Sequence, residues 1–107
     1  MNKLHKTLIS SLLLSSLVCQ ADEQTVDKTE LCFLYAELAK AIMTARQSGM
    51  PMTKVYKLQP KNLMPITSIM ITTAYDIHLY HSPDLKAEAI TNFENTVFST
   101  CLQASQQ

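Results

Sequence analysis

Apolar residues recur at helical spacing along residues 29–47, TELCFLYAELAKAIMTARQ. One stripe returns every three or four residues and consists of Leu31, Leu34, Tyr35, Leu38, Ile42 and Ala45. A second set widens it, as expected for a helix that packs against more than one neighbour, namely Cys32, Ala36, Ala39 and Met43. The pattern predicts a helix that starts at an Asp27 or Thr29 N-cap and stops at Gly49, a residue suited to a left-handed helix end.

Three prolines, Pro51, Pro60 and Pro65, divide the next part of the chain, so only a short helix around residues 53–58 fits there. Residues 66–73, ITSIMITT, are rich in β-branched side chains, which favours a strand by propensity. Their apolar positions recur at three and four rather than at two, which favours a helix after Pro65. The apolar set is Ile66, Ile69, Met70, Ala74 and Ile77. We predict a helix, with a strand as the alternative.

A final helix is predicted to begin after Ser82, which can serve as the N-cap, with Pro83 in the first turn and Asp84 favourable to the helix dipole. The expected inner face is Ala87, Ile90, Phe93, Val97 and Cys101, and the expected outer face is Lys86, Glu88, Asn92 and Asn95. Residues 22–28 and 103–107 are expected to be loose ends. The predicted fold class is therefore all-α, a single domain of residues 22–107 built as a bundle of three to four helices.

The first residues have the order of a cleavable export signal. Lys3 and Lys6 precede an apolar run over residues 8–18, and small residues at Cys19 and Ala21 indicate cleavage after Ala21. The run is about half of the roughly 20 apolar residues that span a bilayer, so residues 1–21 predict a signal peptide and a periplasmic or secreted protein, not a membrane anchor. An outer-membrane lipoprotein acylated at Cys19 is the weaker alternative, because the residues before it match that signal poorly.

Charge and composition exclude several functional classes. Without residues 1–21 the 107-residue chain keeps 86 residues, with nine acidic and seven basic side chains, so no basic surface for nucleic acid is expected. A single glycine, no tryptophan and no internal repeat argue against phosphate-binding loops, propellers and solenoids. The chain contains no G-x-S-x-G and no H-E-x-x-H motif, and we expect neither an enzyme nor a cofactor.

The mature chain has two cysteines, Cys32 and Cys101. An even pair in a small exported domain predicts a disulfide, and no CxxC motif supports a metal or redox role. Helices of about 18 residues are roughly 27 Å long, whereas bridged cysteines need Cα atoms within about 7 Å. Because Cys32 starts the first long helix and Cys101 ends the last, the bridge predicts that these helices run antiparallel.

The stretch AYDIHLYHSPD, residues 74–84, concentrates histidines and acidic residues. His78 and His81 could share a helix face with Asp84 as a third zinc ligand, but Ser82 and Pro83 interrupt the helix there. We interpret the stretch as a helix end and turn. Methionines at Met50, Met52 and Met64 with these histidines would also suit copper(I), so a periplasmic copper- or zinc-binding protein is the alternative function.

Six stretches of the chain form a recognisable layout, namely Cys32, YAELAKAIMTARQSGMPM, AYD, SP, AITNF and Cys101. Written as a pattern, the layout is C…A…IM.ARQ.G..M…AY…AI..F…C. In this layout the chain resembles a group of small proteins of proteobacteria and their prophages. The resemblance implies an all-helical unit in a Gram-negative periplasm and implies no activity. In architecture alone, the chain is also similar to periplasmic acid-stress chaperones and to amidase immunity proteins of type VI secretion.

These observations predict a small exported protein that acts by binding another protein, as an inhibitor, immunity factor or chaperone-like module. Loops on a rigid scaffold commonly carry binding, and methionine and tyrosine adapt well to partners. The expected contact segments are Met50–Tyr56 and Tyr75–His81. The candidate partner-binding residues in them are Met50, Met52, Tyr56, Tyr75, His78, Tyr80 and His81.

We expect protein recovered from cells to begin at Asp22 and to carry Cys32 and Cys101 in oxidised form. Intact-mass spectrometry before and after reduction and alkylation measures both properties. A retained leader, or two cysteines that are alkylated without prior reduction, would contradict the assignment to an oxidising compartment.

Overall fold

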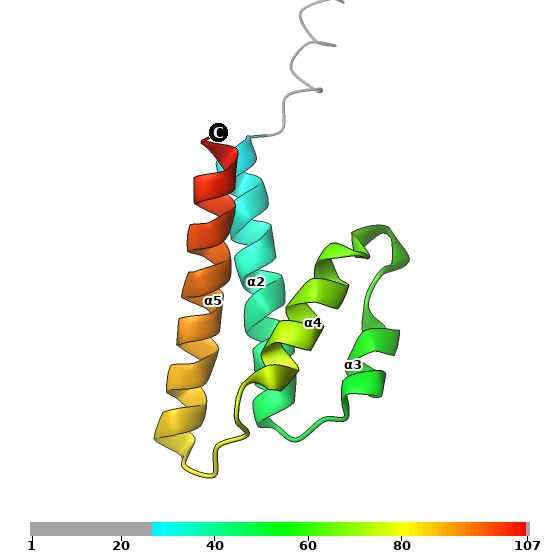
Figure 1. The fold of residues 1–107 in the computed structure, drawn as a ribbon, viewed down its shortest axis with the longest axis vertical. Coiled ribbons are helices and arrows are strands. Elements are labelled where there is room, and N and C mark those ends of the chain that lie inside the picture. The colour runs from blue at the N-terminus through cyan, green and yellow to red at the C-terminus, as the bar shows by residue number, and fades with distance from the viewer. Residues whose placement is uncertain (1–26, 107) are drawn as a thin grey trace, which may run out of the picture.

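The computed structural model describes residues 27–106, which contain four α-helices and one 3-10 helix and no strand (Figure 1). The elements are α2 (Lys28–Gln47), α3 (Met52–Leu58), η1 (Lys61–Leu63), α4 (Ile66–Asp76) and α5 (Pro83–Ser105). The all-α class is confirmed, and residues 66–73 are helical rather than a strand. The predicted signal peptide and Cys19 lie outside the described residues.

Helix α2 has the two ends that its sequence predicts. Asp27 is the N-cap, and its carboxylate accepts a hydrogen bond from the Thr29 N–H at 3.0 Å. At the other end Gly49 has a φ of 84°, and the N–H groups of Gly49 and Met50 donate to Arg46 O and Ala45 O at 3.0 and 3.1 Å. Glycine adopts this left-handed conformation without the penalty that a Cβ atom imposes, so the helix stops there.

Helix α5 begins as predicted but is longer. Ser82 is the N-cap, its Oγ accepts from the Leu85 N–H at 3.4 Å, and Pro83 lies in the first turn. The helix continues through Ser105, so residues 103–105 are helical although the sequence suggested a loose end. Lys28 is also helical, because the Asp27 cap places the start of α2 there.

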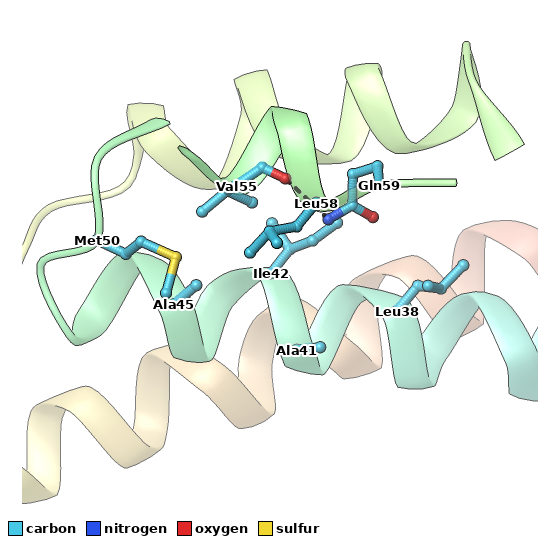
Figure 2. A pocket seen from close by; sticks show the side chains of 8 residues that line it. All are labelled: Leu38, Ala41, Ile42, Ala45, Met50, Val55, Leu58 and Gln59. Carbon is cyan, nitrogen blue, oxygen red and sulfur yellow. Dashed lines mark hydrogen bonds between the residues drawn. The ribbon is translucent and has the colours of Figure 1, made fainter. Parts of the chain in front are cut away.

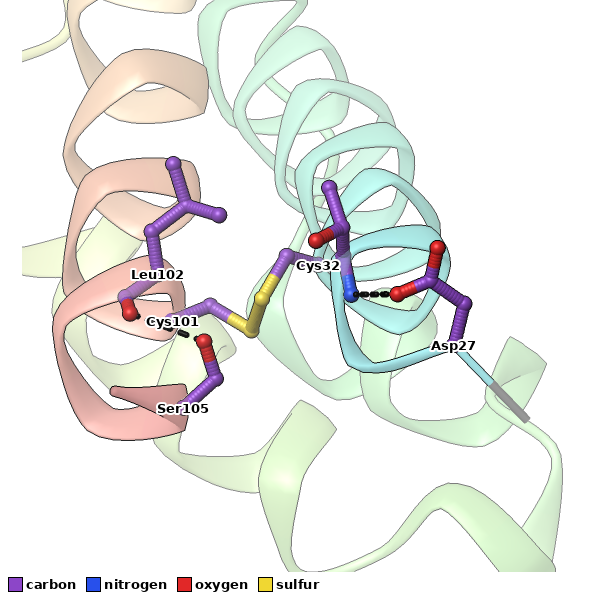
Figure 3. The surroundings of a disulfide bond; sticks show 6 residues. Asp27, Cys32, Cys101, Leu102 and Ser105 are labelled. Atoms are coloured by element: carbon purple, nitrogen blue, oxygen red, sulfur yellow. Dashed lines mark hydrogen bonds between the residues drawn. A yellow bond between two sulfur atoms is a disulfide. The ribbon is translucent and has the colours of Figure 1, made fainter. Parts of the chain in front are cut away.

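The first and last helices, α2 and α5, lie side by side and run in opposite directions, as predicted (Figure 1). Cys32 and Cys101 are joined by a disulfide with their Cα atoms 5.5 Å apart. Figure 3 shows the bridge between the two helices, beside the Asp27 cap and Ser105, whose Oγ donates to Leu102 O. Helix α4 packs against α2, and α3 packs against α4 and α2. None of the helices within residues 27–106 is long and apolar enough to cross a bilayer.

The core lies where α4 and α3 cover the second half of α2. Its buried members are Ala39, Ile42, Met43, Val55, Met70, Ile71, Ala74 and Phe93. On α2 the predicted inner stripe is partly wrong, because Leu31 and Leu34 are exposed while Cys32 and Ala36 are buried. The first half of α2 has α5 as its neighbour, and the small residues on the Cys32 side face that helix, so the leucines remain at the surface.

The inner faces of α4 and α5 also differ from the prediction. On α4, Thr67 and Ile71 are buried whereas Ile66 and Ile69 are exposed, because α4 turns its buried side to α2 and α3. On α5, Ala89 is buried instead of Ala87. Lys86, expected to point outward, is half-buried because its ammonium donates to the Gln47 carbonyl.

Removing the disulfide with Cys32→Ala/Cys101→Ala should lower the free energy of unfolding by about 4 kcal/mol, because the bridge closes a 69-residue separation in the unfolded chain. Urea titration followed by circular dichroism measures the loss. The parent protein under reducing conditions should show a loss of similar size. Equal unfolding midpoints for oxidised and reduced protein would contradict this prediction.

Candidate functional site

The junction between α4 and α5, residues 77–82, is fastened to the C-terminal end of α2. The Arg46 guanidinium donates to Ile77 O through Nε and Nη2 at 3.1 and 3.0 Å. The Gln47 side chain donates through Nε2 to His78 O at 2.8 Å and accepts from the Tyr80 N–H at 3.1 Å. Gln47 is only 2% exposed. A buried amide whose donor and acceptor are both used is a specific tie between segments that are more than 30 residues apart in sequence.

Three further contacts complete this cluster. The Lys86 ammonium donates to Gln47 O at the end of α2, where the helix leaves carbonyls without a partner inside the helix. The Arg46 guanidinium also lies over the Tyr75 ring, 5.0 Å from its centroid. The Tyr75 hydroxyl donates to Met50 O and ties α4 to the loop before α3.

The Tyr75 phenol stays protonated and can therefore donate its hydrogen bond to Met50 O. Partial burial raises the pKa of the Tyr75 phenol above its ordinary value, and the nearby Arg46 charge opposes part of that shift. The neutral phenol is therefore the form that meets Met50 O at neutral pH. Tyr75 and Met50, two candidate partner-binding residues, are thus brought together by an internal hydrogen bond, and both side chains are half-buried.

The histidine-rich stretch is a helix end and turn in the structure. Asp76 is the last residue of α4, and His78 and His81 are both exposed. The His78 ring meets the Tyr80 ring edge-on, with centroids 5.1 Å apart. Residues 27–106 contain no group of three or more His, Cys, Asp or Glu placed to hold a metal ion, so the zinc alternative gains no donor cluster in that range. The copper alternative, which also uses methionines, stays a prediction.

The remaining candidates, Met52 and Tyr56, are exposed on α3 and form a shallow depression of about 290 Å³ together with Thr53 and Lys57. Lys54, Lys57 and Lys61 are also exposed here. We call the exposed side chains of residues 52–61 the α3–η1 surface.

The net charge of the whole chain does not reveal the positive charge of the α3–η1 surface, because acidic residues elsewhere in the chain balance it. Residues 38–75 contain five basic side chains and no acidic one, and the basic set is Lys40, Arg46, Lys54, Lys57 and Lys61. The sequence signal that could have found it is this local run without a carboxylate.

A narrow apolar pocket of about 250 Å³ lies between α2 and α3 (Figure 2). Its lining is Leu38, Ala41, Ile42, Ala45, Met50, Val55, Leu58 and Gln59. The polar member, Gln59, donates through Nε2 to Val55 O at 3.1 Å and so turns its amide to its own helix. The pocket therefore offers little beyond apolar contact, and Met50 points into it rather than joining Met52 at the surface.

A larger apolar groove of about 450 Å³ lies between α4 and α5 and includes Tyr35 of α2. We call it the α4/α5 groove. From α4 it takes Ile66, Ile69, Met70 and Thr73, and from α5 it takes Phe93, Thr96, Val97, Thr100, Cys101 and Ala104. The sequence pattern missed this surface because it assigned most of these apolar residues to the core.

Comparisons with known protein families, with curated proteins and with solved structures return no match for this chain. The resemblance to small proteobacterial and prophage proteins, and the function expected from the sequence, stay predictions.

Replacing Gln47 with alanine should destabilise the protein by about 2–3 kcal/mol, because His78 O and the Tyr80 N–H lose a buried partner. Chemical denaturation measures the change. The matched control is Gln103→Ala on α5, whose amide makes a single exposed contact with Ser99 Oγ and should change stability by less than about 0.5 kcal/mol. Similar losses for the two variants would show that the Gln47 tie is not important for stability.

Proposed function

We propose that this chain is an exported periplasmic protein that binds another protein through its α3–η1 surface, as an inhibitor, immunity factor or chaperone-like module. The observation that carries the proposal is that exposed Met52 and Tyr56 share a shallow depression with Lys57, while Lys54 and Lys61 are exposed on the same segment. Aromatic side chains and methionine are enriched at the centres of protein interfaces, which are surrounded by a polar rim.

The positive charge of the α3–η1 surface favours an acidic partner. Residues 38–75 supply no carboxylate to neutralise the three lysines, so their field extends into solvent. A partner with an acidic rim around an apolar centre complements it, and the attraction would raise the association rate and weaken with salt. Met52 and Tyr56 would supply the contact area at the centre.

The surface is held in place before any partner arrives. Val55 of α3 is buried in the core, and the Tyr75 hydroxyl fixes the loop that leads into α3 through Met50 O. A preformed surface loses less conformational entropy on binding than a disordered segment does. This supports binding as the role of α3 in a domain of so few residues.

The proposed periplasmic location is inferred from the N-terminal leader and the two cysteines. A positive start, a short apolar run and small residues before Asp22 favour export by a cleavable signal peptide. A disulfide between Cys32 and Cys101 is typical of proteins outside the reducing cytoplasm. Both observations support the periplasm as the place where the partner is met.

A photo-crosslinking residue at position 56 should trap one defined protein in the periplasm of living cells. The control is the same residue at Leu85 on α5, because Tyr56 and Leu85 are 48% and 45% exposed. The adduct at position 56 should disappear in Lys54→Glu/Lys57→Glu/Lys61→Glu, since the reversed charges repel an acidic partner. Denaturing electrophoresis and mass spectrometry measure the adducts.

Two results would contradict the proposal. The first is a set of adducts at position 56 that equals the set at position 85. The second is a specific adduct that survives the charge reversal, which would remove the electrostatic basis of recognition. The triple variant should keep the parent circular dichroism spectrum, because all three lysines are exposed.

A further inference from the structure

The two ends of the α2–α5 pair are held by different interactions. On α2 the buried core begins at Ala39, and on α5 its buried member is Phe93. Cys32 lies about two helical turns before Ala39, and Cys101 lies about two turns after Phe93. The disulfide therefore joins helix ends that extend beyond the core (Figure 3). We call residues 28–36 of α2 and 98–105 of α5 the bridged end.

Non-covalent packing at the bridged end is sparse. Leu31, Phe33 and Leu34 are 37%, 57% and 47% exposed. Phe33 meets Phe98 with ring centroids 5.0 Å apart, yet more than half of Phe33 stays in contact with solvent. Ala36 is buried, but an alanine side chain removes little apolar area from water. Segments with few buried apolar contacts open locally at a low cost in free energy, so the bridge is what keeps this end closed.

The two sulfur atoms of the bridge differ in access. Cys32 is 0% exposed, whereas Cys101 is half-buried and lines the α4/α5 groove. Thiol–disulfide exchange requires that the attacking thiolate reach one sulfur directly. The groove leads a thiolate to Cys101 Sγ, and Cys32 is then the departing thiolate.

We propose that the Cys32–Cys101 bond is a redox switch, and that its reduction by a dithiol protein releases the bridged end while the core stays folded. One thiolate of the dithiol attacks Cys101 Sγ, the bond to Cys32 Sγ breaks, and Cys32 leaves as a thiolate that takes up a proton. The second thiol of the dithiol then attacks the mixed disulfide, which releases Cys101 as a thiol and oxidises the dithiol. Two electrons and two protons thereby pass to this chain.

Reduction changes the α4/α5 groove, because part of its wall belongs to the bridged end. Tyr35 of α2 and Thr100, Cys101 and Ala104 of α5 are groove residues in the released segments. The core and the Gln47 hydrogen bonds lie at the other end of the pair, so the α3–η1 surface keeps its place in both redox states. The switch therefore stands apart from the proposed partner binding.

Nuclear magnetic resonance of the protein, purified from cells that express the full chain, tests the switch. With excess dithiothreitol, backbone order parameters of residues 30–36 and 98–102 should fall from about 0.85 to below about 0.6, while those of residues 39–47 and 86–93 stay near 0.85. Cys32→Ser/Cys101→Ser should show the same pattern without reductant. The matched control is oxidised Gln47→Ala, which loses the hydrogen bonds at the other end and should leave residues 30–36 ordered.

The route of attack has its own measurement. Acid quenching soon after glutathione is added, followed by peptide mapping with mass spectrometry, should find the mixed disulfide on Cys101 at least about 10-fold more often than on Cys32. Equal or greater labelling of Cys32 would overturn the route. The switch itself is overturned if dithiothreitol does not reduce the bridge in the folded protein, if the bridged end stays ordered after reduction, or if reduction unfolds the whole domain.

Discussion

The pairing of α2 with α5 is the constraint on which the rest of the structure depends. At one end of the pair α3 and α4 provide a core, and the Gln47 amide fastens the junction that reverses the chain. At the other end those helices do not cover α2, and the Cys32–Cys101 bond holds α2 against α5 instead. The disulfide at the end without α3 and α4, and the buried hydrogen bonds at the end with the core, together hold the two long antiparallel helices side by side although the core is small.

This arrangement leaves apolar side chains at the surface. Because the buried side of α2 that faces α5 is made of small residues, the large ones nearby remain exposed, and Phe33 meets Phe98 across the helix pair with ring centroids 5.0 Å apart. On α4, Ile66 and Ile69 are exposed because this helix turns its other side, with Met70 and Ile71, toward α2 and α3. These exposed apolar side chains are consistent with the proposed role in binding.

The sequence predicted the features that depend on local chemistry. Asp27, Gly49 and Ser82 set helix ends in the expected way, and two cysteines predicted both the bridge and the antiparallel helices. The prediction of the inner helix faces was less accurate. Helical spacing shows which residues share a side of a helix but not which side has a neighbour, and Leu31 and Ile69, both predicted to be inside, are exposed.

The candidate site was predictable only in part, because its residues depend on tertiary partners. Met52 and Tyr56 were expected at a contact surface and are exposed on α3. Tyr75 was expected there too, but its hydroxyl is used internally by Met50 O. Gln47 reads as an ordinary polar residue near a helix end, and its importance comes from a backbone segment 31 residues away.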